Sequence, residues 1–194
     1  MRVFINEREI SSGAAPGATV GEIIEAGRVH VDPSEIVTAV ELDGVEFHAG
    51  DEAQYVRRAA RGVRELRIST RGPAAFAAEK RRSLAEALDA VAARSRMVST
   101  LLRESETRSA NGLLACLMEE LRLMLLLDYQ LALLAADEPG AAREEIEALA
   151  PQLLAAEEGR AWEALASLLD GSLAPVLERW AAATRARPGA SPTF

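Results

Sequence analysis

The sequence is poor in the residues from which most metal and redox sites are built. Among its 194 residues are one cysteine, Cys116, and two histidines, His30 and His48. A single cysteine excludes an internal disulfide and a zinc ribbon, and neither histidine has a cysteine or a cluster of aspartates near it in the sequence. Cys116 lies among leucines, so we expect a small buried apolar side chain in a reducing cytoplasm. These shortages favour a protein that uses no metal and no cofactor.

Sequence motifs of the common enzyme classes are also missing. The chain has neither a Gly-x-Ser-x-Gly turn nor a Gly-Lys-Ser/Thr phosphate-binding loop. Glu119, Glu120 and Asp128 resemble the carboxylates of a di-metal bundle, but the Glu-x-x-His element of such bundles is absent. We interpret these three residues as part of the solvent-exposed side of a helix. We therefore expect no enzymatic activity and no catalytic residue, and an unfamiliar site around residues 67–80 stays the alternative.

The sequence has no apolar run long enough to cross a membrane. Its richest stretch, residues 113–134, is interrupted by four charged residues, each of which is costly in lipid. The first residues, MRVFIN, are followed at once by charged residues and do not make the apolar centre of a signal peptide. We therefore expect a cytoplasmic protein with no membrane partner.

An excess of acidic residues argues against nucleic acid as a partner. The chain has 30 acidic and 22 basic residues and a formal net charge of -8, which repels nucleic acid at long range. One basic run has no aromatic residues between its arginines for stacking on bases. We expect this run to be a solvated face or a dock for an acidic protein. It consists of Arg57, Arg58, Arg61, Arg64 and Arg67.

What the sequence does contain is a change of period near Thr70. Before it, apolar residues alternate in short strands, and after it they recur at the helical spacing of three and four residues. This change predicts an α+β protein with two modules, residues 1–70 and 73–185, each with its own core. A tail over residues 186–194 lacks apolar spacing, so we expect it to be disordered. The many alanines and the preference for arginine over lysine indicate a GC-rich bacterial genome.

The first module begins with signals for two hairpins and a helix. Alternating apolar residues on both sides of a polar turn at residues 6–8 predict the first hairpin. Thr19 and Glu22 stand in capping-box spacing and predict a short helix after them. The pair Asp43-Gly44 between two β-branched runs predicts the second hairpin, because both turn positions need positive φ.

A brief helix and a last strand complete the first module. Asp51 can cap the helix, Gly62 can stop it, and Leu66 and Ile68 belong to the strand. The order of elements and the Asp43-Gly44 turn resemble the ubiquitin-like β-grasp superfamily over residues 1–70. Carriers and modifiers of that superfamily end in an exposed Gly-Gly, whereas here the strand runs on into a helical region. The resemblance therefore implies a docking module without carrier chemistry.

The second module is predicted to be a helical bundle rich in alanine and leucine. Pro73 can begin a first helix, which we expect to end at Arg108. Its narrow apolar stripe fits an internal face or the seam of a coiled-coil homodimer. A second helix, capped by Ser109 or Asn111, has leucines around most of its circumference, so we expect it at the centre of the bundle. The stripe consists of Leu84, Leu88, Val91, Ser95, Val98 and Leu102.

Proline and glycine mark the remaining helices. A third helix begins at Ala142, is kinked or split at Pro151 and ends near Gly159. We expect a kink in the last helical stretch between residues 171 and 175. Trp180 in this stretch fits either ordinary core packing or an interface anchor, because tryptophan is enriched at binding hot spots.

The two modules without catalytic residues favour a bacterial protein-binding adaptor or scaffold. The alternative is an export-type chaperone, similar to those of flagellar export, whose bundle shields a helix of its client. In either case the partner is a protein, or a second copy of the chain in a homodimer. The candidate interface residues are Leu84, Leu88, Val91, Val98, Leu102 and Trp180.

Overall fold

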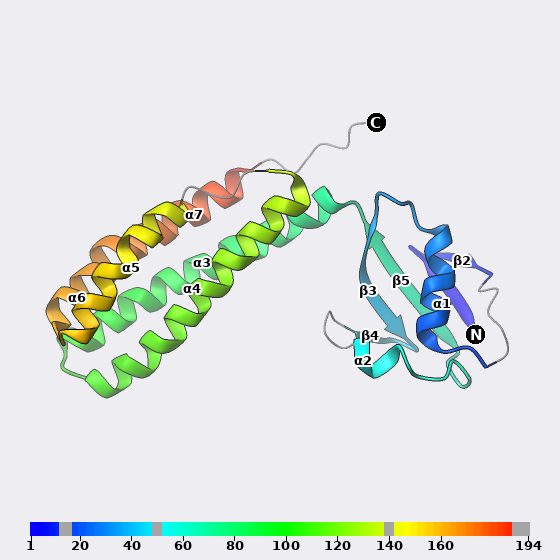
Figure 1. Cartoon of the computed structure of the whole chain (residues 1–194), viewed down its shortest axis with the longest axis horizontal. Helices are drawn as coiled ribbons and strands as arrows, with labels where there is room; N and C mark the ends of the chain where they lie inside the picture. Colours follow the sequence, from blue (N-terminus) through cyan, green and yellow to red (C-terminus); the bar gives the residue numbers. More distant parts are fainter. Residues whose placement is uncertain (12–16, 48–51, 138–141, 188–194) are drawn as a thin grey trace. The chain divides into compact units, whose positions relative to one another are not determined.

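A computed structural model describes residues 1–11, 17–47, 52–137 and 142–187 of the chain. The chain divides into two compact units, Met1–Phe76 and Ala77–Phe194 (Figure 1), and each unit has its own cluster of buried apolar residues. We call them the sheet unit and the helical unit. The structure confirms the predicted α+β class.

The described residues of the sheet unit form a five-stranded sheet in the order β2-β1-β5-β3-β4. The neighbours β1 and β5 are parallel, and the other neighbouring pairs are antiparallel. Both predicted hairpins are confirmed. The strands are β1 (Arg2–Ile5), β2 (Arg8–Ile10), β3 (Ile36–Leu42), β4 (Val45–Phe47) and β5 (Glu65–Arg71).

The turn between β3 and β4 also holds the start of β5. Asp43 and Gly44 have φ of 49° and 85°, as a tight hairpin turn requires. The carboxylate of Asp43 accepts hydrogen bonds from the backbone N–H groups of Glu65, at 2.9 Å, and Arg64, at 2.8 Å. These bonds favour the ionised form and hold the pKa of Asp43 below its usual range.

Helix α1 (Val20–Gly27) covers one face of the sheet (Figure 1). It begins with the predicted capping box, in which the Thr19 side chain accepts from the N–H of Glu22 and the Glu22 carboxylate accepts from the N–H of Thr19. Val20, Ile23 and Ile24 pack on inward-facing residues of the strands. The buried strand residues are Val3, Ile5, Val40, Leu42, Leu66 and Ile68.

Two single-turn helices complete the sheet unit. The 3-10 turn η1 (Arg28–His30) follows α1, and α2 (Glu52–Tyr55) follows β4. The brief helix predicted before Gly62 is confirmed, but it ends earlier, at Tyr55. Its predicted cap, Asp51, lies outside the described residues.

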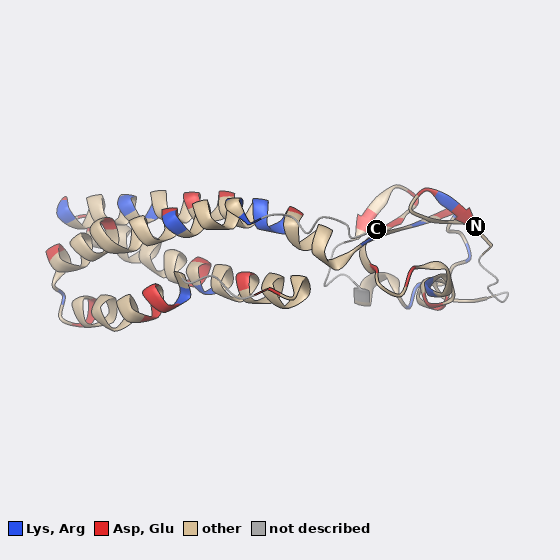
Figure 2. Cartoon of the chain, turned by 90° about the horizontal axis from the view of Figure 1, so that it is seen from above, with Lys and Arg blue, Asp and Glu red and all other residues tan. Residues whose placement is uncertain are grey.

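The helices of the helical unit pack side by side around one apolar core (Figure 1). Figure 2 shows that acidic and basic residues both occur along these helices. Ion pairs join α3 to α4 through Arg94 and Glu120, and α5 to α7 through Glu145 and Arg179. The elements are α3 (Pro73–Arg103), α4 (Thr107–Ala135), α5 (Ala142–Glu158), α6 (Trp162–Leu168), η2 (Leu169–Leu173) and α7 (Ala174–Ala186).

The turn between α3 and α4 lies earlier than predicted. Helix α3 ends at Arg103 instead of Arg108, and the predicted caps, Ser109 and Asn111, lie inside α4. Ser105 has a φ of 65°, and the N–H of the next residue bonds to the carbonyl of Leu101 at 2.9 Å. This left-handed helix end is usually made by glycine or asparagine. A serine gives no such signal in the sequence, which explains the error.

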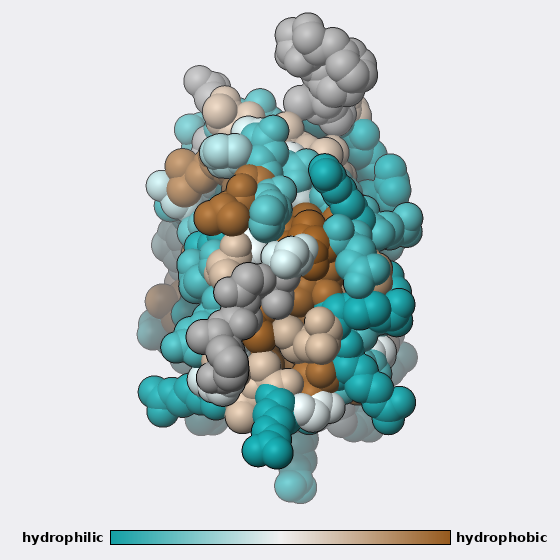
Figure 3. Space-filling view, turned by 90° about the vertical axis from the view of Figure 1, so that its right-hand side faces the viewer, coloured by the Kyte–Doolittle hydropathy of each residue, from teal (hydrophilic) through white to brown (hydrophobic). Residues whose placement is uncertain are grey.

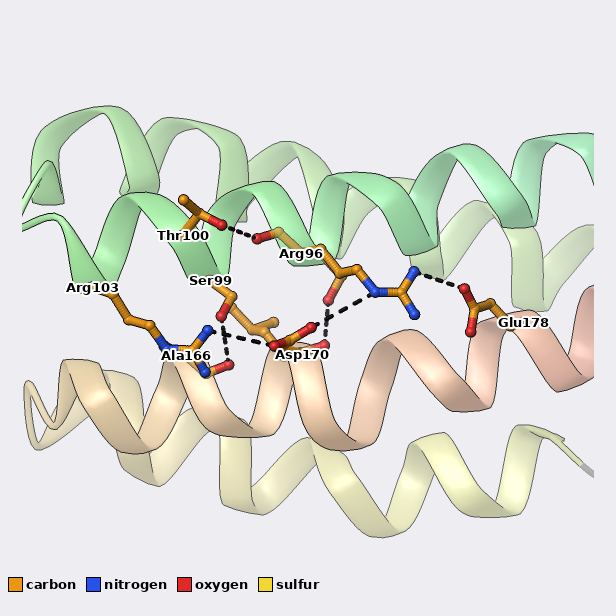
Figure 4. Close-up of polar contacts among 9 residues, drawn as sticks. Arg96, Ser99, Thr100, Arg103, Ala166, Asp170 and Glu178 are labelled. Carbon is orange, nitrogen blue, oxygen red and sulfur yellow. Dashed lines mark hydrogen bonds and ion pairs between the residues drawn. The ribbon is translucent and has the colours of Figure 1, made fainter.

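The last helical stretch changes its hydrogen bonding where the sequence predicted a kink. Residues Leu169–Leu173 are π-helical, and the N–H of Ala174 donates to the carbonyl of Leu169. Two buried serines of α3 donate to the backbone of the last helical stretch. Ser95 donates to the carbonyl of Leu169 at 2.8 Å, and Ser99 donates to the carbonyl of Ala166 at 2.9 Å (Figure 4). The bond from Ser95 therefore joins α3 to the first residue of the π-helical segment, and the bond from Ser99 joins α3 to α6.

The other sequence signals in this unit had mixed outcomes. Pro151 lies inside α5 without splitting it, and α5 ends just before Gly159 as predicted. Helix α7 continues to Ala186, so the predicted tail begins inside the helix. The rest of that tail, residues 188–194, lies outside the described residues.

Candidate protein-binding surface

Helix α4 is buried along one side only. Its core side contains Leu114, Leu117 and Leu121, whereas five large side chains on the opposite side are between 37% and 59% exposed. At 100° per residue these five lie within an arc of about 160°. The prediction that α4 is central and buried all round is therefore wrong. We call the five exposed residues the α4 surface; they are Leu123, Leu126, Leu127, Tyr129 and Leu133.

The α4 surface carries no exposed charge. Between Leu123 and Ala136, all of which the structure describes, the one charged residue is Asp128, which is 3% exposed. Charges lie at the two ends of the surface, where Arg122 pairs with Glu119 at 3.6 Å and Asp137 pairs with Arg81 at 2.6 Å. The exposed and uncharged Gln130 lies among the five residues, so the surface is mostly apolar with charges at its two ends. This is the usual anatomy of a protein interface.

Cys116 lies on the same side of α4 as this surface. It is exposed, and it precedes Leu123 by seven residues, which is about two turns of helix. The prediction that Cys116 is buried was wrong, because the leucines beside it in the sequence point to other sides of the helix. As the sole cysteine of the sequence, it offers one attachment point for a probe.

The six residues predicted from the sequence as interface candidates are in the core of the helical unit instead. Each is at most 4% exposed. The stripe on α3 is therefore an internal face of the single chain and is closed to a partner, and Trp180 is a core residue. The sequence had left two alternatives for this stripe, an internal face and the seam of a homodimer. The six are Leu84, Leu88, Val91, Val98, Leu102 and Trp180.

The carboxylates of α4 do not share one solvent-exposed side of the helix. Glu119 is exposed, Glu120 pairs with Arg94, and the buried Asp128 lies 3.6 Å from Arg187. Within the described ranges, no group of three or more His, Cys, Asp or Glu residues is arranged to hold a metal ion. Among the same residues, no helix has the length and apolarity that crossing a membrane requires.

The sheet unit has a hollow that is lined by both polar and apolar residues. Figure 3 shows that the face seen there is hydrophilic over most of its area, with apolar groups uncovered near its centre. A hollow of about 550 Å³ is lined by residues of the first hairpin together with His30, Asp32 and Glu35. Beside it, Asn6 donates to the hydroxyl of Thr70 at 2.6 Å, and Thr70 donates to Glu35. These bonds connect the hairpin turn to β5 and to Glu35, the residue before β3. The other histidine, His48, lies outside the described residues.

The arginines of the sheet unit form a solvated face in part. Arg57, Arg58, Arg61 and Arg64 are exposed. Arg67 is half-buried, bonds to Glu65 at 2.6 Å and lies 4.7 Å above the ring of Phe4.

No protein-family model, curated protein or solved structure matches the chain. The α4 surface is therefore selected on its exposure and lack of charge alone.

Proposed function

We propose that the chain is a non-enzymatic adaptor that binds another protein through the α4 surface. The observation that carries this proposal is the exposure of four leucines and a tyrosine on a helix whose opposite side is buried. Exposed apolar residues that occur singly are normal, but a contiguous group with a polar rim marks an interaction site. Elsewhere on the described helices the large exposed side chains are dispersed, as are Met97 on α3 and Leu154 on α5.

The occupant that fits this surface is an amphipathic helix of the partner. Leu123, Leu126, Leu127 and Leu133 follow helical spacing, and a second helix can pack its own apolar stripe between them. Burying a whole leucine side chain contributes about 1.5–3 kcal/mol, so completing the burial of four half-exposed leucines contributes about 4 kcal/mol before binding costs. The charged pairs at the two ends would then fix the orientation of the partner helix.

The sheet unit would act as the second docking module of the adaptor. Its strand order, the parallel pair β1–β5 and the packing of α1 on one face support our inference that it is a ubiquitin-like β-grasp domain. Its edge strands, β2 and β4, have three residues each. Such short edges limit pairing with a partner strand, so the α4 surface is the better candidate for the main contact.

The test compares variants of the full-length chain as bait and then as purified protein. Leu126→Glu combined with Leu133→Glu places two charges on the α4 surface, and Leu154→Glu is the matched control, since Leu154 is 54% and Leu126 52% exposed. A partner captured by the unmodified chain is purified and titrated against each variant by calorimetry. We expect at least about tenfold weaker binding for the double variant and unchanged binding for the control.

Two results would contradict the proposal. The first is equal affinity of the double variant and the Leu154→Glu control for the captured partner, which would place the contact elsewhere. The second is a dimer of the unmodified chain that the double variant abolishes, because the α4 surface would then be occupied by a second copy. Light scattering coupled to size exclusion measures this. A client that leaves after delivery to an export machine would instead identify a chaperone using the same surface.

A further inference from the structure

An arginine-lined pocket opens where the N-terminal half of α3 meets the end of α7. Its volume is about 600 Å³, within the range of small-molecule sites. Four of its eight lining residues are arginines, and Glu86 is the one carboxylate among the eight. Arg81 and Arg82 lie on α3, Arg185 lies on α7, and Arg187 follows the end of α7.

Two of these arginines have buried N–H groups without a hydrogen-bond partner. The side chain of Arg81 is 5% exposed; its Nη2 donates to Asp137 at 2.6 Å, while its Nε has no partner in the described part of the chain. The Nη1 of Arg187 is also buried without a hydrogen bond, and it lies 3.6 Å from an oxygen of Asp128. Both nitrogens are closed to solvent as the side chains stand. Buried donors without a partner are costly, so a small rotation of these side chains that brings the donors to acceptors of a ligand in the pocket is favoured.

Three carboxylates hold the arginines from outside the pocket lining. Asp137 pairs with Arg81, Asp89 with Arg185, and Asp128 lies beside Arg187. These three carboxylates and Glu86 together balance the four positive charges of the arginines. The pocket would therefore attract an anion through the oriented N–H groups of the arginines more than through its net charge. Guanidinium groups that are already oriented lose less conformational freedom on binding.

Arg82 is the arginine with unused capacity. It is exposed, and it makes no ion pair or hydrogen bond with the residues that the structure describes. An arginine presents five N–H donors in a planar fork that matches the oxygens of phosphate. We propose that this pocket binds the phosphate group of a small phosphorylated ligand, with Arg81, Arg82 and Arg187 donating to its oxygens. The volume left beyond one phosphate group would hold the rest of the ligand.

The test titrates the full chain with sodium pyrophosphate by calorimetry at constant ionic strength. We expect saturable binding that Arg82→Gln weakens about tenfold, which is the loss of one charge-assisted hydrogen bond. Glu86→Gln removes the carboxylate that lines the pocket, so it should strengthen binding. Arg108→Gln is the matched control, because Arg108 is an exposed arginine of α4 outside the pocket, and it should leave binding unchanged.

Three results would overturn the proposal. They are the absence of saturable binding at millimolar pyrophosphate, equal affinities of the Arg82→Gln and Arg108→Gln variants, and binding of sodium malonate as tight as that of pyrophosphate. The last result would assign the pocket to carboxylates. Arg82 is exposed, so its variant should fold, and the far-ultraviolet circular dichroism of each variant checks this.

Discussion

Truncating a leucine to alanine should cost much more stability in the core of the helical unit than on the α4 surface. Leu88 is 0% exposed and packs in the core, whereas Leu126 is 52% exposed on the α4 surface. We expect Leu88→Ala to reduce the free energy of unfolding by about 2–5 kcal/mol, since it loses the transfer energy of the side chain and leaves a cavity. Leu126→Ala leaves no cavity and should cost less than about 1 kcal/mol.

Tryptophan fluorescence measures this difference in the helical unit alone. Both tryptophans, Trp162 and Trp180, lie in that unit, so their emission during urea unfolding reports on the helical unit. With a slope of about 1–3 kcal/mol per molar urea, a loss of about 3 kcal/mol lowers the midpoint by about 1–3 M. A shift for Leu126→Ala as large as that for Leu88→Ala would refute the assignment of Leu126 to the surface.

Three further predictions concern hydrogen bonds, packing and pH. Ser95→Ala should lower the urea midpoint of the helical unit through the loss of about 1 kcal/mol, while Thr100→Ala, which removes an exposed hydroxyl, should change the free energy of unfolding by less than about 0.5 kcal/mol. Gly21→Ala would place a Cβ 2.6 Å from the Val56 side chain and 2.9 Å from its carbonyl oxygen, so it should destabilise the sheet unit by about 1–3 kcal/mol, measured by amide hydrogen exchange. The pKa of Asp43 is lowered in the folded state, so the stability that its ionised carboxylate contributes is complete above about pH 4 and is lost as pH falls through the lowered pKa. Asp43→Asn should remove this part of the dependence of stability on acid pH, which amide NMR spectra recorded against pH can measure.

Local signals in the sequence predicted the sheet unit well because each has a short-range physical cause. The capping box at Thr19 and Glu22 satisfies free N–H groups within one turn. The Asp43-Gly44 turn has the two positive φ angles that a tight hairpin needs. Neither depends on distant residues, so both could be found without the structure.

The errors in the helical unit concern features that depend on tertiary packing. Periodicity showed that α4 is rich in leucine all round, but it does not show how many neighbours cover the helix. Three helix ends have positive φ at residues other than glycine, which are Ser105, Ala136 and Arg160, and the first of these caused the misplaced end of α3. The hydrogen bond from Ser95 joins residues 74 positions apart, so a serine in an apolar stripe did not indicate its partner.

The candidate surface was only partly visible in the sequence. The sequence predicted a leucine-rich helix here, but no residue of the α4 surface was among the interface candidates. Its signal was present as leucines at positions that complete the circumference of α4. What the sequence lacked was the assignment of one side to the core and the other to solvent, which comes from the packing of α4 in the helical unit.

Site-specific photocrosslinking in cells tests the central claim most directly. A photoreactive phenylalanine analogue is placed in turn at Leu126, Leu133 and Leu154, and the adducts are identified by mass spectrometry. We expect that one and the same protein is crosslinked from Leu126 and Leu133, through a segment with helical spacing of apolar residues, and that Leu154 gives no such adduct. Adducts of this protein that are equally abundant from all three positions, or adducts from Leu154 alone, would contradict the assignment of the α4 surface as the docking site.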